Sequence, residues 1–292
     1  MVVPFAAGGP ADVVARIIGE RMASSLGQAI VIENVSGADG VIGTGRVARA
    51  QPDGYTLNLG TLAANVLNGA AYSLSYDLLK DFEPIALLSA NPYLLIARKT
   101  VPANNLIELT AWTKANQDHV SLGVTSVNQR VVGALFQKLL GVHLQFLPYR
   151  GAGPALQDLI AGQIDLLFDQ PTNSMPQVRA GTIKVFAVAA STRLPTAPEI
   201  PTADEAGLPG LYMLNWNAIF APKNTPKMIV AKLNNAAVYA LGDPAVRARF
   251  AELGTDIPPR DQQTPEALGN LQKVDIQKWW PIVKEANIRG EQ

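Results

Sequence analysis

The chain has 292 residues, which suggests two domains at the usual size of about 100–200 residues each. Its 24 basic and 24 acidic residues balance, which argues against a nucleic-acid binder, because such proteins normally carry a clustered basic excess. The absence of cysteine excludes disulfides, thiolate nucleophiles and cysteine-based metal sites, and no apolar run reaches the roughly 20 residues of a membrane-spanning helix.

The N-terminal third repeats one pattern, in which a short apolar run leads through a small or glycine-rich loop into an amphipathic helix. Strands are predicted at residues 1–5, 29–35 and 55–60, and the helices that follow them are expected to end near Gly27, Ala50 and Tyr72. Because the sequence starts directly on a strand, we expect preceding residues, including any secretion signal, to be missing from it; a cytoplasmic protein that begins abruptly is the alternative.

After Pro102 the same alternation continues. Helices are expected at residues 106–116, 129–140 and 155–161, and strands at residues 120–124, 144–149, 164–168 and 183–190. This order predicts βαβ units and therefore an α/β fold with mostly parallel sheets. In such sheets, ligands bind at the carboxyl ends of the strands.

The C-terminal third has a different character. Four prolines between residues 195 and 209 mark a crossing segment, and helices are predicted at residues 226–241, 244–253 and 265–286. Too little strand remains there for an independent α/β domain, so we expect this part to pack on the first lobe. The predicted organisation is a discontinuous lobe 1, residues 1–98 plus 219–292, and a lobe 2, residues 99–218.

Four loop–helix junctions are the most informative local feature. They lie at residues 8–12, 61–65, 125–129 and 151–155. A helix N-terminus has unpaired N–H groups and a partial positive charge, and small loop residues let an anion approach them closely. Together the junctions would form an anion site without Lys or Arg, although for any one junction an ordinary turn is the favoured interpretation.

Groups for catalysis are scarce. The two histidines, His119 and His143, lack a neighbouring nucleophile motif, and surface positions explain both. No nucleophile elbow, zinc-protease motif, calcium loop or phosphate-binding loop occurs. We therefore predict no catalytic residue, no metal and no cofactor.

Three charged residues have two interpretations each. Asp12, in a first helical turn, either caps the helix or else fixes the loop or meets a ligand. Asp169 follows an apolar strand, where it faces a site or caps the next helix. Arg150, at another strand end, is either solvated or a carboxylate clamp.

The chain also resembles a known family, and an ordered set of short segments carries the likeness. These are PFAAGGPAD at residues 4–12, ENVSGADG at 33–40, ARAQPDGYTL at 48–57, DFEPI at 81–85, PYRG at 148–151, PA at 154–155, DL at 158–159, GQID at 162–165, PT at 201–202, EAG at 205–207, FAP at 220–222 and KW at 278–279. Over essentially its whole length the chain resembles the periplasmic substrate-binding receptors of tripartite tricarboxylate transporters, also called Bug receptors.

The resemblance implies a two-lobe Venus-flytrap fold of the type II periplasmic kind, with a small carboxylate held in a cleft between the lobes. It implies no catalysis, a periplasmic monomer, and a membrane permease as partner. By motif, the ligand contacts would come from these residues: Ala7, Gly8, Gly9, Pro10, Ala11, Asp12, Thr61, Leu62, Ala63, Ser126, Val127, Asn128, Ala152, Gly153 and Asp169.

Two departures from the family pattern affect the ligand. Ala63-Ala64 stands where the family often has Thr-His, and residues 125–129 stand where it often has a Gly/Ser-rich loop. A roomier or more apolar corner would suit an aromatic or longer acid, so dicarboxylates, tricarboxylates, acidic amino acids and aromatic acids all stay open. A sensory module with the same site and, less favoured, an enzyme on a two-lobe frame are the alternatives.

Overall fold

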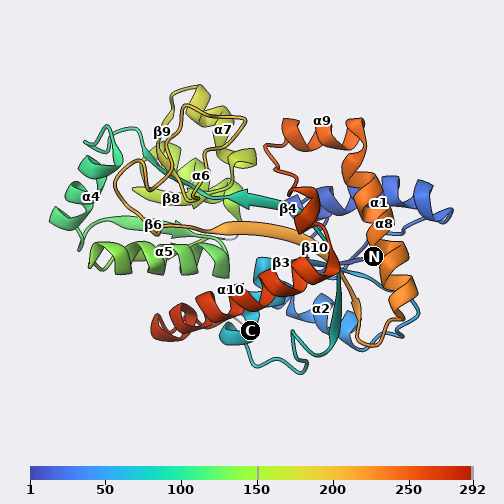
Figure 1. The fold of residues 1–292 in the computed structure, drawn as a ribbon. Helices are drawn as coiled ribbons and strands as arrows, with labels where there is room; N and C mark the ends of the chain where they lie inside the picture. Colours follow the sequence, from blue (N-terminus) through green and yellow to red (C-terminus); the bar gives the residue numbers. More distant parts are fainter. Residues whose placement is uncertain (150, 291–292) are drawn as a thin grey trace. The chain divides into compact units, whose positions relative to one another are not determined.

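The computed structural model describes residues 1–149 and 151–290. The chain divides into two compact units, unit 1 (Met1–Ala90 and Trp216–Gln292) and unit 2 (Asn91–Asn215). It passes between them within β4 (Phe82–Pro92) and β10 (Leu214–Pro222), whereas the sequence pattern places the crossings at 98/99 and 218/219 (Figure 1). Within the described ranges, no helix is long and apolar enough to cross a membrane.

Unit 1 is built on a five-stranded sheet in the order β2-β1-β3-β10-β4. Its short strands are β1 (Val2–Val3), β2 (Glu33–Asn34) and β3 (Asn58–Thr61). β1 pairs in parallel with β2 and β3, and β10 runs antiparallel to β3. β2 is shorter than the predicted strand at residues 29–35, because β1 offers only two residues for pairing.

The helices of unit 1 come from both ends of the chain. They are α1 (Pro10–Leu26), η1 (Ala38–Gly40), α2 (Val41–Ala48), η2 (Ala63–Leu67), α3 (Asn68–Ala71), α8 (Lys227–Gly242), α9 (Pro244–Glu252), η3 (Arg260–Gln262) and α10 (Pro265–Glu285). α1 packs on α8, and Figure 1 shows the two side by side. Ile18, Met22 and Leu233 lie in their shared core, so the C-terminal helices complete the N-terminal unit.

Unit 2 has its own five-stranded sheet, in the order β7-β6-β8-β5-β9. The strands are β5 (Leu94–Arg98), β6 (Ser121–Val124), β7 (Gln145–Pro148), β8 (Leu166–Asp169) and β9 (Ile183–Val188), and the helices are α4 (Leu106–Ala115), α5 (Val127–Leu140), α6 (Ala152–Ala161) and α7 (Pro171–Arg179). β6 is parallel to β7 and β8, while β5 is antiparallel to β8 and β9. Four of the five strands therefore share one direction, in an α/β fold.

Candidate functional site

The loop between β1 and α1 presents an exposed helix N-terminus. Gly8 has a left-handed φ of +80°, and its surroundings leave open space where a side chain would start. Gly9 caps α1, and Pro10 occupies the first turn, where its missing N–H costs nothing. The N–H groups of Ala11 and Asp12 lie in the first helical turn and have no intrahelical acceptor. Together with exposed Ala7, they form an amide-lined surface.

Asp12 fixes this loop. Its Oδ2 accepts hydrogen bonds from the Gly8 amide at 2.8 Å and Arg16 Nε at 2.9 Å, and its Oδ1 accepts one from Asn34 Nδ2 at 3.0 Å. Burial acts to raise the pKa of Asp12, but the hydrogen bonds from Arg16, Gly8 and Asn34 outweigh it and lower that pKa to about 2. The carboxylate is occupied by donors of its own chain, and its contact with a ligand stays a prediction.

A second junction in unit 1 follows β3. Thr61 Oγ1 accepts a hydrogen bond from the Ala64 amide at 3.1 Å and so caps the helical segment that begins there. The side chain of Leu62 is fully buried, and Ala63 is only 5% exposed. At these two predicted contact positions, the backbone amides are therefore the groups that can bind an anion.

The helical segment after Ala63 is a π-helix, η2, rather than the plain helix that the sequence pattern predicts. Side chains of α10 bind two of its carbonyl groups. Gln272 Nε2 donates to the Asn65 carbonyl at 2.9 Å, and Trp280 Nε1 donates to the Val66 carbonyl at 2.8 Å. These two α10 residues position the second junction. Nothing local in the sequence indicates them, because they are more than 200 positions away from this junction.

In unit 2, the first junction is the N-terminus of α5. Ser126 caps α5 in an extended conformation, and its Oγ donates to Gln129 Oε1 at 2.5 Å. Val127 is buried and packs inward. Asn128 is 5% exposed and donates from Nδ2 to Asn215 Oδ1 at 3.0 Å, and more weakly to Tyr93 Oη at 3.3 Å. Asn128 Oδ1 is buried without a hydrogen-bond partner.

The second junction of unit 2 is the N-terminus of α6. Gly151 precedes the helix at a left-handed φ of +115°, and Ala152 and Gly153 form the first turn. Gly153 is exposed with open space around it, so the first-turn amides can be reached from solvent. Arg150, the predicted carboxylate clamp, lies outside the described residues.

Asp169 ends β8 and is 2% exposed. Its Oδ2 accepts a hydrogen bond from Asn173 Nδ2 at 2.7 Å. Burial raises the pKa of Asp169 to about 6, although the hydrogen bonds from Asn173 and the Gln170 amide act in the opposite direction. Asp169 is therefore a buried carboxyl group that accepts hydrogen bonds from the helix that follows it.

Sheet topology gathers the predicted residues within each unit. In unit 1, residues 7–12 and 61–63 follow the parallel neighbours β1 and β3. In unit 2, residues 126–128, 152–153 and Asp169 lie at the carboxyl ends of β6, β7 and β8, which are also parallel neighbours. This is the end at which ligands bind in open α/β sheets. Their contact with one ligand stays a prediction.

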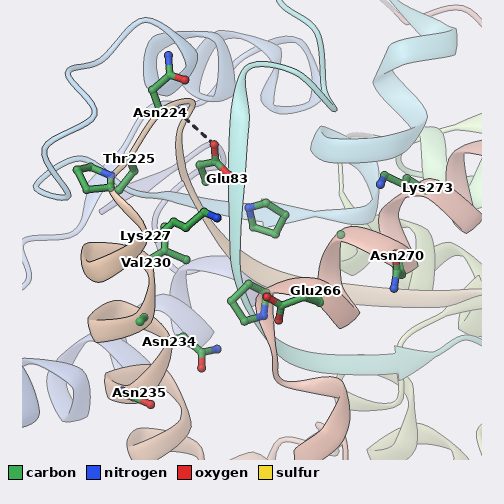
Figure 2. Close-up of a pocket in the computed structure, with 15 residues that line it drawn as sticks. Glu83, Asn224, Thr225, Lys227, Val230, Asn234, Asn235, Glu266, Asn270 and Lys273 are labelled. Carbon is green, nitrogen blue, oxygen red and sulfur yellow. Dashed lines mark hydrogen bonds between the residues drawn. The ribbon is translucent and has the colours of Figure 1, made fainter.

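The described residues contain no group of three or more His, Asp or Glu side chains that could hold a metal ion. What the junctions offer chemically is a set of N–H donors for an anion. Unit 1 also carries an open groove of about 980 Å³ between α8 and α10 (Figure 2). Positively and negatively charged side chains line it, among them Glu83, Lys227, Glu266 and Lys273. None of the predicted contact residues lines this groove.

Comparison with known proteins agrees with this architecture. MatC (Rpa3494) from Rhodopseudomonas palustris, solved with bound malate, is 43% identical with a TM-score of 0.85, and the match covers 97% of each chain. The periplasmic binding protein BugD is 40% identical with a TM-score of 0.84, over 99% of this chain and 97% of that one. Rpa4515 from R. palustris, solved with adipate, is 31% identical with a TM-score of 0.86, over 99% and 96%.

These neighbours share the two-lobe periplasmic-binding-protein fold, which confirms the predicted fold class. The model of the tripartite tricarboxylate transporter family receptor matches residues 14–288, nearly the whole chain. The chain therefore belongs to the receptor family of the tripartite tricarboxylate transporters.

Proposed function

We propose that this protein is an extracytoplasmic receptor that captures a small carboxylate and delivers it to a membrane permease. The observation that carries the proposal is the pair of amide-lined junctions in each unit, at the carboxyl ends of parallel strands. Backbone N–H groups at helix N-termini bind a carboxylate without changing their protonation state, which suits reversible capture and release.

The proposed contacts are the fifteen residues named above, nine in unit 1 and six in unit 2. A ligand that contacts both units favours the conformation in which both sets can reach it, by its difference in affinity for the two conformations. The crossing strands β4 and β10 are the connections at which such a change would occur. We expect the liganded form to be the one that the permease recognises.

The ligands of two solved neighbours support one class of carboxylate as the first to test. MatC holds malate and Rpa4515 holds adipate, which are both small aliphatic diacids. A dicarboxylate is therefore the first candidate for this chain. Because BugD is a periplasmic binding protein, we also propose a periplasmic location, and we expect a monomer.

A thermal-shift screen of aliphatic dicarboxylates, tricarboxylates, acidic amino acids and aromatic acids tests the proposal, with the diamide of each diacid as the matched control. A ligand at 100 times its Kd adds about 2.7 kcal/mol of stability, which raises Tm by several degrees. We expect a shift with an acid, no shift with its amide, and recovery of the acid unchanged. Conversion of the acid would instead favour an enzyme.

A variant with a negative charge at the proposed α6 contact tests that contact directly. Gly153→Asp puts a carboxylate beside the first-turn amides of α6, where open space accommodates it. The new charge repels an anionic ligand, while it is favourable for the helix itself. Gly242→Asp, on an exposed and equally open position of unit 1, is the control. Equal affinity in both variants would contradict the proposed contact at α6.

A further inference from the structure

β10 leaves unit 2 and enters unit 1 between Asn215 and Trp216, and each of these side chains is anchored in its own unit. In unit 2, Asn215 Oδ1 accepts a hydrogen bond from Asn128 Nδ2 at 3.0 Å. In unit 1, Trp216 Nε1 donates to Asp275 Oδ2 of α10 at 2.8 Å. Because the two anchors are on neighbouring residues, the part of β10 that can bend between them is reduced to the dihedral angles beside one planar peptide bond.

The anchor in unit 1 joins a buried indole to a carboxyl group. Trp216 is 1% exposed, and its ring packs against Phe220 with the ring centroids 6.3 Å apart. Burial raises the pKa of Asp275, while the hydrogen bond from Trp216 acts in the opposite direction. Lys278 and Trp279 also lower this pKa, but both belong to α10 itself. Among these contacts, the bond from Trp216 is therefore the one that joins α10 to β10.

The same helix connects this anchor with a proposed ligand contact. Gln272 lies three positions before Asp275, so the two side chains share a face of α10. Gln272 Nε2 donates to the Asn65 carbonyl of η2 at 2.9 Å. On the side of the sheet, Asn217 of β10 pairs with Thr61, the residue that caps this junction. The Thr61 junction and the unit 1 end of the β10 crossing are therefore held by one set of contacts.

The crossing in β4 is tied to the crossing in β10. In unit 1, Asn217 Nδ2 donates to Ser89 Oγ at 3.0 Å. In unit 2, the Tyr93 amide donates to the Met213 carbonyl at 3.3 Å. The two crossing strands are thus joined on each side of the boundary, so a restraint on Trp216 restrains both of them.

We propose that Asp275 is a positioning residue for ligand capture: it holds Trp216 and so keeps the bending point of β10 at the Asn215–Trp216 peptide. The proposal rests on the proposed function, because capture requires the amides of both units to reach one ligand. Without the bond, the ligand-free protein samples more arrangements of its units. A ligand that selects one arrangement then binds more weakly, because more conformational entropy is lost on binding.

Distances between spin labels test this without a ligand. The chain has no cysteine, so Glu20→Cys in α1 and Lys114→Cys in α4, both exposed, place one label on each unit. We expect the distribution of distances to widen in Asp275→Ala and Trp216→Phe, and to keep its width in Asp275→Asn, which retains an oxygen acceptor. Asp243→Ala removes a carboxylate that caps α9 in the same unit, so it controls for lost stability and should not widen the distribution. An unchanged width in Asp275→Ala and Trp216→Phe would overturn the proposal.

Calorimetry with malate, adipate and the other acids of the thermal-shift screen tests the effect on capture. We expect the Kd of each bound acid to rise roughly 3- to 10-fold in Asp275→Ala and in Trp216→Phe, which is part of what a hydrogen bond to a charged group contributes. Asp275 acts through Trp216, so the order of preference among the acids should stay the same. Because both changes remove one bond, the double variant should lose about as much affinity as either single variant.

The two measurements separate the possible failures. Additive losses in the double variant, or an unchanged Kd beside a widened distance distribution, would overturn the role of Asp275 in capture. A merely structural role would lower Tm in Asp275→Ala, as in Asp243→Ala, and leave Kd unaltered at temperatures where both variants are folded. Binding of no acid at all would overturn the proposed function, while the label distances would still decide whether Asp275 fixes the crossing.

Discussion

The hydrogen bonds that Asp12 accepts allow the most direct test of what holds the loop at Gly8 in place. Asp12→Ala removes three hydrogen bonds to a buried carboxylate. The three donors are not left buried without an acceptor. The Arg16 side chain is 54% exposed and Gly8 is exposed, so both remain open to water. Asn34 Nδ2 still donates to the Phe5 carbonyl at 3.0 Å. The cost is therefore the net value of the bonds rather than the larger penalty of buried unpaired groups.

Each contribution can be weighed separately. The pair with Arg16 is half exposed and screened by solvent, so it adds little to the free energy of unfolding. The bonds from the Gly8 amide and Asn34 contribute about 1 kcal/mol each. The expected loss is about 2 kcal/mol in the free energy of unfolding, or roughly 4–8 °C in Tm.

Urea and thermal denaturation of Asp12→Ala and Asp12→Asn measure this loss. Asn keeps an oxygen for the Gly8 amide and should lose about half as much. Ligand affinity should fall in the same order, because the loop at Gly8 is released. The pKa of Asp12 near 2 lies below its ordinary value of 3.8, so its contribution is present above about pH 4 and is lost as pH falls towards 2. A Tm of Asp12→Ala within 1 °C of the unaltered protein, at neutral pH, would refute the reasoning.

Three further predictions follow from single positions. The pKa of Asp169 is raised to about 6, so ligand-free stability should fall as pH rises from about 4 to 6, and a pH series of urea denaturations should lose this slope in Asp169→Asn. Gln272→Leu leaves two buried carbonyl groups without their donor and should cost about 2–4 kcal/mol; a loss below about 1 kcal/mol would contradict this. Gly43→Ala places a Cβ 2.6 Å from the Val35 carbonyl oxygen and should lower Tm strongly, whereas Gly242→Ala, in open space, should not.

The local elements of the fold could be predicted because their signals lie close together in the chain. Pro10 at the start of α1 and Gly27 at its end, with a left-handed φ of 69°, fall where the sequence pattern puts them. β4 and β5 were missed as strands, because Asn91 and Pro92 interrupt the apolar run that contains both. Strands of this kind are recognised from their partners in a sheet, which lie far along the chain.

The same distinction applies to the candidate site. Small residues followed by a helix start indicate a loop–helix junction, so the positions of the junctions could be predicted. The bond from Asn128 to Asn215 joins residues 87 positions apart, and nothing local indicates it. The sequence also does not indicate that Gly8 and Asn34 donate hydrogen bonds to the Asp12 carboxylate, because these bonds depend on how β2 lies beside β1.

The attachment of η2 to α10 has a consequence for the order in which the protein matures. Unit 2 is one uninterrupted stretch of chain, so it can fold as soon as Asn215 has left the ribosome. The Thr61 junction cannot reach its final form then, because the donors that hold η2, Gln272 and Trp280, emerge last. During synthesis, the N-terminal half of unit 1 therefore stays unfinished until α10 has emerged.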